Sequence, residues 1–424
     1  MADNIAILKK YNFWDGMFPD LGFIRRDYLD KIRSLTGNRL VKVLVGQRRA
    51  GKSVILRQTI KDLVAQGVSP TNIFYLNKEY TDFDFVSDYK DLDMLIKAYL
   101  ELQKPHGKVY LFVDEVQDIA GWERLVNSYA QTHVDNYEVF ISGSNAHMLS
   151  GELATLLSGR YVEMQVFTFQ YEEYVAYLEL EKGKASFLAY LKSGGLPELF
   201  MLPNDEVKRN YLSAIRDAIL LRDVVQRFNI KDTRLLEDVF AFLVNNASNL
   251  VSVNTLVNYF ASKNRKTNYE TLSNYISHLS GAFIIHQAER YHIKGKDILS
   301  GNCKYYMNDL SFKNFLYPGF SYGYGYMLEN LVYLQLRHAG YQVYVGYIRN
   351  REIDFVAIKN DRTIYIQSAY MLNEQTTIDR EYSQLEAIPD HHEKYVVSLD
   401  DLTLPNRGGI RHIQAWNLTD SVLH

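Results

Sequence analysis

Residues 40–53 read LVKVLVGQRRAGKS, and this stretch decides the fold. Its first six residues form a short apolar run with β-branched side chains, which is typical of a buried strand. The residues that follow it, VILRQTIKDLVAQG, have helical periodicity. Between the two lies the pattern G-x-x-x-x-G-K-S, over Gly46–Ser53. A strand, this pattern and a helix in succession predict a phosphate-binding P-loop rather than a chance glycine-rich turn.

The residue types in this loop suit a nucleoside triphosphate. Gly46 and Gly51 let the backbone turn tightly and bring its N–H groups against phosphate oxygens. The first turn of the helix adds its dipole and its unpaired donors. We expect Lys52 to contact the β- and γ-phosphates and the Ser53 hydroxyl to bind Mg²⁺. The predicted ATP-binding residues are Gly46, Gln47, Arg48, Arg49, Ala50, Gly51, Lys52 and Ser53.

A second, acidic element follows in residues 108–117, which read KVYLFVDEVQ. The run VYLFV predicts a parallel strand that neighbours the first, and ligands of such sheets bind at the carboxyl ends of the strands. Asp114 ends this strand and is predicted to hold Mg²⁺ together with Ser53, while Glu115 is predicted to polarise the attacking water. The alternative is that the two acids form a solvated loop pair, and the P-loop upstream disfavours it.

Two further predictions concern the next polar segments. The strand-like run EVFIS leads into Gly143, Ser144 and Asn145, and we expect Ser144 or Asn145 to sense the γ-phosphate. The alternative there is a turn that caps the end of the strand. Arg160 is either an arginine finger, acting in the same or in a neighbouring subunit, or a salt-bridged surface residue.

Strands and helices alternate through this part of the chain. Such a βαβ series predicts an α/β fold with a mostly parallel sheet and helices on both faces. The predicted strands are residues 40–45, 72–76, 109–113, 137–142 and 162–167, and the predicted helices are residues 52–65, 92–103 and 122–132.

Five segments together resemble a known family. The sequence is similar to the AAA-type P-loop ATPases of bacteria and archaea, in the branch whose ATPase domain precedes a domain of unknown function, DUF4143. The resemblance covers nearly the whole chain, and it implies ATP binding and hydrolysis with Mg²⁺ but no defined cellular role. The segments are FIRRDYLDKI at 23–32, GQRRAGKS at 46–53, LFVDEVQDIAGWE at 111–123, FISGSNAHMLSGELATLLSGRY at 140–161 and FTFQYEEY at 167–174.

The patterns and the resemblance divide the chain into four parts. Residues 1–170 form the AAA-type ATPase domain, and residues 171–230 form a helical lid that a Gly/Pro turn interrupts. A winged-helix-like domain spans residues 231–315. A nuclease-like domain, the C-terminal part of DUF4143, spans residues 316–424.

Residues 231–315 predict three short helices and a β-hairpin. The third helix begins near Asn268, and in a DNA-binding protein it would enter the major groove. Its outward residues carry no Lys or Arg, whereas basic residues precede it and lie in the hairpin, so DNA contact and a packing role both stay open. The outward residues are Glu270, Ser273, Asn274, Ser277 and His278, and the basic ones are Lys263, Arg265, Lys266, Lys294 and Lys296.

The last part has the order α-β-β-β-α-β and resembles the PD-(D/E)xK nuclease-like fold. An active member needs an acid at the end of one strand and E-x-K on the next, because carboxylates hold Mg²⁺ and the lysine assists the water. Asp354 fits the first acid, and Glu329 fits an optional acid on the helix. Gln367 stands where the second carboxylate belongs and Ala369 where the lysine belongs. The sequence therefore predicts a degenerate site that does not cleave DNA.

Composition excludes other classes of protein. The chain has 424 residues, 47% of them hydrophobic and 13% aromatic, which disfavours disorder. Its 47 Lys and Arg nearly balance 50 Asp and Glu, so charge neither favours nor excludes a nucleic-acid partner. Cys303 is the single cysteine, no apolar run is long enough to span a bilayer, and no secretory signal is present. We expect a cytoplasmic protein without a membrane partner, and an oligomer is compatible with the sequence.

Three functional hypotheses follow. The favoured one is Mg²⁺-dependent ATP binding and hydrolysis that drives a conformational switch acting on DNA or on a protein partner. The second is a nucleotide-gated module that binds DNA or protein with little turnover. The third, an active nuclease, is disfavoured by Gln367 and Ala369.

Overall fold

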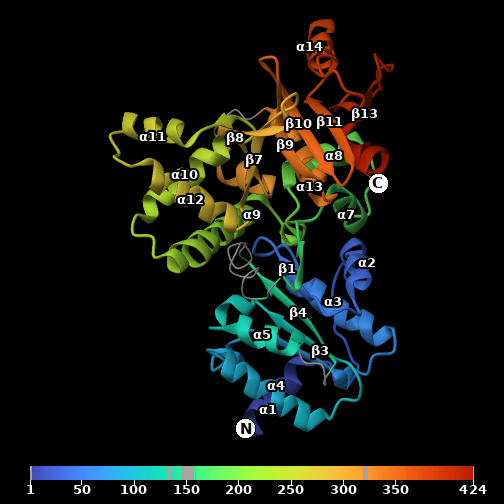
Figure 1. Cartoon of the computed structure of the whole chain (residues 1–424), viewed down its shortest axis with the longest axis vertical. Coiled ribbons are helices and arrows are strands. Elements are labelled where there is room, and N and C mark those ends of the chain that lie inside the picture. The colour runs from blue at the N-terminus through green and yellow to red at the C-terminus, as the bar shows by residue number, and fades with distance from the viewer. Residues whose placement is uncertain (1, 132–135, 145–156, 158, 319–322, 424) are drawn as a thin grey trace. The chain divides into compact units, whose positions relative to one another are not determined.

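The computed structural model forms two compact units, Met1–Val166 and Phe167–His424. It describes residues 2–131, 136–144, 157, 159–318 and 323–423 (Figure 1). The predicted ATPase domain corresponds closely to the first unit. The segments predicted as lid, winged-helix-like domain and nuclease-like domain all lie in the second unit.

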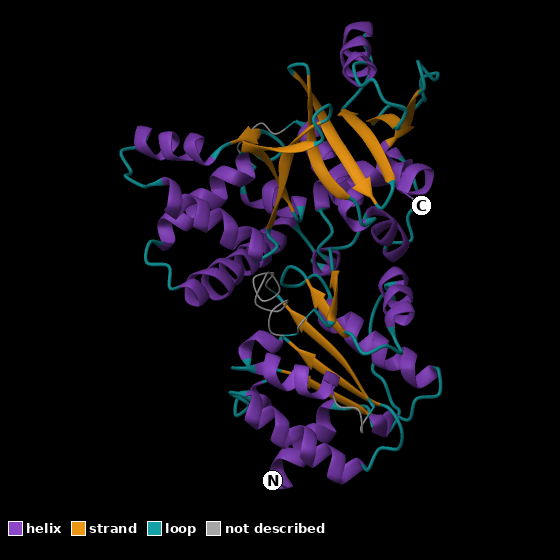
Figure 2. Cartoon of the chain, viewed as in Figure 1, coloured by secondary structure: helices purple, strands orange, loops and turns teal. Residues whose placement is uncertain are grey.

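A five-stranded parallel sheet forms the centre of the first unit, in the order β2-β3-β4-β1-β5 (Figures 1 and 2). This confirms the predicted α/β fold with a parallel sheet. One detail of the prediction was wrong: the acidic strand β3 does not neighbour β1, because β4 pairs with both of them. The strands are β1 (Val41–Val45), β2 (Ile73–Asn77), β3 (Val109–Asp114), β4 (Tyr137–Gly143) and β5 (Tyr161–Gln165).

Helices flank this sheet, so its central strands are hidden from water. All residues of β1, β2 and β3 are buried, which explains why they read as apolar runs rather than as alternating patterns. The helix after the P-loop and the two that follow agree with the predicted segments. The helices are α1 (Ala2–Tyr11), α2 (Arg26–Leu35), α3 (Lys52–Ala65), α4 (Tyr89–Gln103) and α5 (Trp122–Gln131).

An eight-stranded mixed sheet forms the centre of the second unit, in the order β13-β12-β11-β10-β9-β7-β8-β6. The hairpin of the winged-helix-like segment and the strands of the nuclease-like segment share this sheet, because β7 pairs parallel to β9. The strands are β6 (Leu250–Val251), β7 (Ile285–His292), β8 (Asp297–Met307), β9 (Gln342–Ile348), β10 (Arg351–Lys359), β11 (Arg362–Ala369), β12 (Glu393–Ser398) and β13 (Ile410–Gln414).

The helices of the second unit follow the predicted order. Three helices, α10, α11 and α12, precede the β7–β8 hairpin, and α13 and α14 flank the strands β9–β11 in sequence. The four-part division of the chain stays a prediction, because one sheet runs through its last two parts. The helices are α7 (Tyr171–Tyr177), α8 (Lys184–Ser193), α9 (Asp205–Ala218), α10 (Thr233–Asn245), α11 (Val253–Ser262), α12 (Tyr269–Gly281), α13 (Tyr324–His338) and α14 (Gln375–Glu386).

A buried histidine gives the second unit a pH dependence that can be measured. His286 on β7 shares a 2.8 Å hydrogen bond with Oδ1 of Asn308. Burial lowers the pKa of His286 to about 4, from the ordinary 6.5, although the hydrogen bond to the Asn308 oxygen opposes the shift. The neutral ring is favoured in the folded unit, so stability is fully present above pH 6.5 and falls as the pH drops towards 4.

We expect the free energy of opening around β7 and β8 to fall by about 2 kcal/mol from pH 7.5 to pH 5 because of His286. The difference between the wild type and His286→Gln, measured by native-state hydrogen exchange of these two strands at both pH values, isolates this contribution. An equal change in both proteins would contradict the prediction.

Candidate nucleotide-binding site

The P-loop connects the carboxyl end of β1 to the first residue of α3, as its sequence predicts. Gly46 has φ +152°, and a Cβ at this position would lie 2.2 Å from the carbonyl oxygen of Val166. Gly51 precedes α3 in the left-handed region, with φ +98°. Both positions therefore require glycine, one because of close approach and the other because of its backbone conformation.

The lysine of the loop is buried at the start of α3. Lys52 Nζ lies 3.0 Å from the carbonyl oxygen of Gly46 and 3.2 Å from that of Gln47. It also lies 3.5 Å from Oε1 of Glu115, the residue directly after β3. The ammonium group is thus held among loop carbonyls and one carboxylate, at the position expected for a group that binds phosphate.

Asp114, the last residue of β3, is completely buried. Its Oδ2 accepts hydrogen bonds from the Tyr75 hydroxyl at 3.1 Å and from Asn77 Nδ2 at 3.0 Å, both on β2. Its Oδ1 accepts one from the Ser142 hydroxyl on β4. Burial raises the pKa of Asp114, as does the charge of Glu115, and the Ser142 and Ser53 hydroxyls oppose this shift.

The oxygens of Asp114 and Ser53 suit Mg²⁺. The hydrogen bond between them shows that P-loop and β3 bring together the two predicted ligands. Within the described residues, no three His, Cys, Asp or Glu side chains are grouped so that they could hold a metal ion. Proteins usually hold Mg²⁺ through one or two side-chain oxygens, with substrate phosphates and water as the other ligands, so Asp114 and Ser53 fit this ion.

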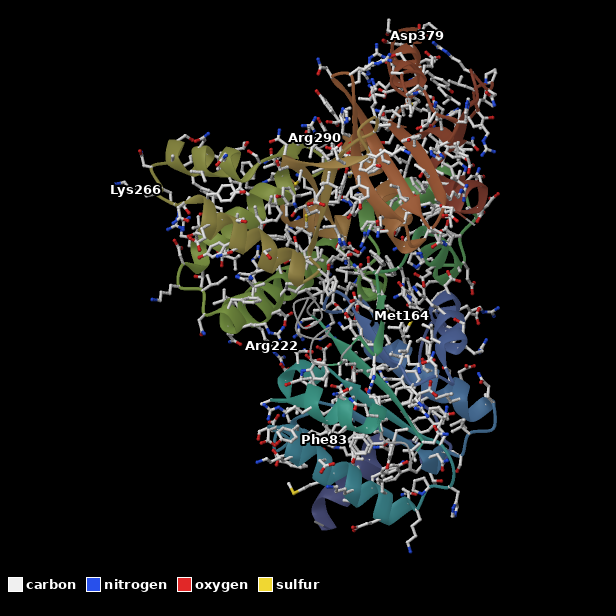
Figure 3. All side chains as sticks on the ribbon, in the orientation of Figure 1. Phe83, Met164, Arg222, Lys266, Arg290 and Asp379 are labelled. Carbon is white, nitrogen blue, oxygen red and sulfur yellow. The ribbon has the colours of Figure 1, made fainter. Side chains whose placement is uncertain are left out.

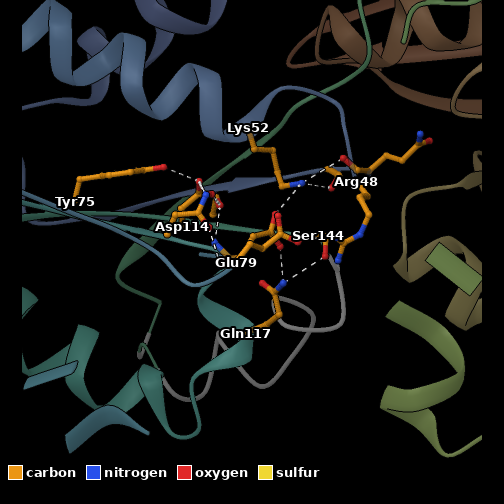
Figure 4. A network of polar contacts seen from close by, with 12 residues as sticks. Arg48, Lys52, Tyr75, Glu79, Asp114, Gln117 and Ser144 are labelled. Carbon is orange, nitrogen blue, oxygen red and sulfur yellow. Dashed lines mark hydrogen bonds and ion pairs between the residues drawn. The ribbon is translucent and has the colours of Figure 1, made fainter. Parts of the chain in front are cut away.

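Glu115 lies beside Lys52 with its backbone in the left-handed region, at φ +53°. Its N–H donates to the Ser142 hydroxyl at 3.1 Å, and its Oε2 accepts from Gln117 Nε2 at 2.5 Å (Figure 4). Burial would raise the pKa of Glu115, but the charge of Lys52 and the hydrogen bond from Gln117 outweigh it and leave the pKa below its ordinary value. The carboxylate is therefore ionised and can accept a proton.

The polar residues at the end of β4 complete the cluster. Ser144 is buried, and its Oγ lies 3.4 Å from Gln117 Nε2. The predicted sensor residue Ser144 thus contacts the cluster that contains Glu115 (Figure 4). Asn145, the other candidate, lies outside the described residues.

The two arginines of the loop lie at its outer side. Arg48 forms an ion pair with Glu79, which follows β2 (Figure 4). Arg49 is exposed, with φ +68°, while Gln47 is fully buried. Of the predicted ATP-binding residues, Arg49 is exposed, while Arg48 and Ser53 are half-buried.

Arg160 lies away from this cluster. Its carbonyl accepts from the N–H of Val41, the first residue of β1, at 3.0 Å, and β5 begins directly after it. The P-loop follows the opposite end of β1, about 15 Å along the strand. An arginine finger in the same subunit would have to span most of this length from the opposite end of the strands, and no contact of Arg160 with the described residues of the cluster supports it. A role in a neighbouring subunit stays a prediction.

The sequence is similar to a known domain and to two known proteins. The AAA domain matches residues 38–175, which include every P-loop and acidic residue of the site. The chain is also 35% identical over 378 residues to an uncharacterized protein of Haemophilus influenzae, and this alignment covers 88% of the chain and 92% of that protein. The chain belongs to the same family as this Haemophilus influenzae protein, and its residues 38–175 form an AAA domain. A second relative, from Methanocaldococcus jannaschii, is 29% identical over 82% of the chain and 79% of its own length.

The second unit of this ATPase matches another family. A domain of unknown function, DUF8612, matches residues 184–320. This match does not support the predicted relationship to DUF4143, which stays a prediction. None of the helices in the described part of the ATPase is long and apolar enough to cross a bilayer.

Two solved structures show distant similarity to the ATPase. A Walker-type ATPase of Pyrococcus abyssi is 15% identical, with a TM-score of 0.43 over 71% of this chain and 98% of that one. The Orc1 protein of Aeropyrum pernix, solved in complex with DNA, is 14% identical, with a TM-score of 0.35 over 73% of this chain and 97% of that one. At these scores neither structure indicates a substrate or a partner of the ATPase.

Five residues contact the site but are not among the residues that the sequence predicts for it. Asn77 ends an apolar strand and Ser142 lies near the end of another, so the polar residues at strand ends were the available signal. Gln117 ends the acidic segment 108–117, but its residue type alone does not predict a role. The missed residues are Arg25, Tyr75, Asn77, Gln117 and Ser142, and Arg25 contributes a 2.9 Å hydrogen bond to the carbonyl oxygen of Ala50 in the P-loop.

The predicted nuclease-like residues surround a lysine. Lys304 Nζ on β8 lies 2.8 Å from Glu329, 2.7 Å from Glu352 and 3.7 Å from Asp354. Gln367 Oε1 accepts from the backbone N–H of Asp354 at 3.3 Å. Glu329, Asp354 and Gln367 are thus brought together as predicted, but sequence reasoning missed Lys304, which lies on a distant hairpin.

Lys304 and the carboxyl groups of this second cluster shift one another's pKa values. Burial raises the pKa of Glu329 to about 8, and Lys304 opposes that shift. Burial would lower the pKa of Lys304, but Glu329, Asp354 and Glu352 outweigh it and hold the pKa above its ordinary value. Lys304 is therefore a cation within the acidic cluster, and the loss of the metal chemistry stays a prediction.

The face predicted for DNA contact is only partly as expected. His278 was predicted to point outward from α12, but its ring stacks on Phe228 at 3.7 Å, so it is packed. Arg265 forms ion pairs with Asp232 and Asp238. Lys263 and Lys266 are exposed around the turn between α11 and α12, where Figure 3 shows Lys266. Further predicted residues of this face, Glu270, Asn274 and Ser277, are exposed, and Ser273 is half-buried.

We expect Gly46→Ala to lower the free energy of unfolding of the first unit by about 3 kcal/mol and to abolish nucleotide binding, because its Cβ would overlap the backbone at Val166. The matched control is Gly67→Ala. Gly67 has φ +97° but no heavy atom within 4 Å of the added Cβ, so about 1 kcal/mol is expected there, with binding retained. Chemical denaturation and calorimetric titration with an ATP analogue measure both. Equal effects at the two positions would contradict the close-approach argument.

Proposed function

We propose that this chain binds ATP with Mg²⁺ at the P-loop and hydrolyses it. The observation that carries the proposal is the buried cluster of Lys52, Asp114 and Glu115, which brings a cation, a carboxylate for the metal and an ionised base together at one edge of the sheet. P-loop backbone donors and the start of α3 support the same assignment, since they suit phosphate oxygens.

Each side chain of the cluster has a distinct role in this proposal. Lys52 binds the β- and γ-phosphates as a point charge. Ser53 and Asp114 hold Mg²⁺, which when bound neutralises charge on the phosphates. Glu115 accepts a proton from the attacking water, while Ser144 contacts the γ-phosphate side of the site. Water forms a bond to the γ-phosphorus as the bond to the β-phosphate oxygen breaks, so the products are ADP and phosphate.

The proposed output is a conformational switch in the second unit that acts on DNA or on a protein partner. The exposed Lys263 and Lys266 support DNA, because lysines at a turn can contact phosphates without reading bases. The outward face of α12 bears no Lys or Arg among its predicted contact residues, so the proposed contact is with the backbone and is independent of sequence.

Glu115→Gln should reduce phosphate release from Mg²⁺-ATP by about 100-fold or more while leaving ATP binding intact, because only the base is lost. Lys52→Ala should instead abolish binding, because the phosphates lose their cation. The matched control is Glu101→Gln, at an exposed glutamate of α4 in the same unit. A wild-type chain that releases no phosphate, alone or with DNA, would contradict hydrolysis. A Glu115→Gln chain as active as the control would contradict the role of Glu115.

Replacing Lys263 and Lys266 together by alanine should weaken binding of double-stranded DNA and lower the salt slope of the affinity by about 2, one for each phosphate contact. The control pair is Lys31→Ala with Lys61→Ala, at exposed lysines of the first unit. Fluorescence anisotropy at several salt concentrations measures the slope. If the wild type binds no DNA with or without an ATP analogue, the protein partner is favoured instead.

A further inference from the structure

Gln117 makes contacts in the nucleotide site that no role in the reaction yet explains. It lies in a short turn, Val116–Asp118, directly after Glu115. Its Nε2 donates to Oε2 of Glu115 at 2.5 Å and lies 3.4 Å from Oγ of Ser144. One amide group therefore connects the residue that acts as base to the end of β4 (Figure 4).

The chemistry of the neighbours fixes the orientation of this amide. A carboxylate oxygen only accepts hydrogen bonds, so the NH₂ group of Gln117 must face Glu115. Its Oε1 is buried and has no hydrogen-bond partner among the described residues. A buried amide oxygen without a partner is costly, so the hydrogen bonds of Gln117 within the described residues come from its NH₂ group alone.

The backbone N–H of Glu115 donates to the Ser142 hydroxyl, so its carboxylate is left to be held by other side chains. The residue has φ +53° and ψ +51°, a conformation that side chains other than glycine seldom adopt. Its two carboxylate oxygens are held from different sides, Oε1 lying 3.5 Å from Lys52 and Oε2 accepting from Gln117. Of the two contacts, the one from Gln117 is the shorter and the directional one.

We propose that Gln117 is a positioning residue that holds the Glu115 carboxylate and makes its position depend on Ser144. The inference rests on the proposed ATPase function and adds to it a link between two parts of the site. Ser144 follows β4 and Glu115 follows β3, so the amide spans two neighbouring strand ends. When the Ser144 hydroxyl contacts a γ-phosphate, it loses its contact with Gln117. The Gln117 amide and the Glu115 carboxylate that it holds then change position.

Gln117→Met tests the role, because methionine keeps the length of the side chain and removes the N–H groups. We expect kcat for ATP to fall by about 10- to 100-fold, since small displacements of a catalytic group cost this much, while KM and analogue binding stay within about twofold. The matched control is Gln66→Met. Gln66 also donates to a carboxylate, that of Asp62 at 2.6 Å, but it is exposed and directly follows the last residue of α3.

A double variant separates positioning from packing. Ser144→Ala and Gln117→Met should together reduce kcat by less than the product of their separate effects, because both act on the same contact. A purely structural residue would give independent effects. Thermal unfolding checks each variant, and Gln117→Ala replaces Gln117→Met if methionine prevents folding.

The outcomes are distinguishable. If the wild type is active and Gln117→Met keeps kcat within about twofold of Gln66→Met, the positioning role is overturned and the ATPase function stands. If KM rises while kcat is kept, Gln117 contacts nucleotide and the positioning role is again overturned. If the wild type does not hydrolyse ATP at all, the proposed function fails, and the role of Gln117 fails with it.

Discussion

The first unit depends on the burial of three charged side chains in one place. Lys52, Asp114 and Glu115 are 3%, 0% and 5% exposed. An ion taken out of water costs several kcal/mol unless it is paired and hydrogen-bonded, so the surrounding elements have to meet the needs of all three. Lys52 is close to Glu115, and Asp114 takes donors from β2 and β4. The P-loop and three strands must be in register for the site to exist.

The sequence predicted the elements of this unit well, because the signals were local. Apolar runs gave the strands, and the glycine and lysine positions of Gly46–Ser53 gave the loop between strand and helix. Strand order was not predictable in the same way. The position of β4 between β1 and β3 depends on how the strands pair. The residues within any one strand do not predict this pairing. The same reason explains Arg160, whose place depends on β5 pairing beside β1.

In the second unit, the sequence shows which residues of an active nuclease are missing, but not what surrounds the carboxylates that remain. Gln367 and Ala369 predict that the metal chemistry is lost, but they do not show which cation lies beside the remaining carboxylates. Lys304 supplies the charge from β8, and only the shared sheet brings it to Glu329 and Asp354. His278 is a similar case, since a helical pattern shows which residues share a face but not which faces are packed.

The tight contact at Gly46 has a consequence for communication along the chain. The carbonyl that excludes a side chain there belongs to Val166, whose N–H also donates to the carbonyl of Val45 at 2.6 Å. Val166 is the last residue of the first unit, and the next peptide bond enters the second. Any displacement of the loop backbone at Gly46 would therefore meet the residue through which the chain leaves the parallel sheet.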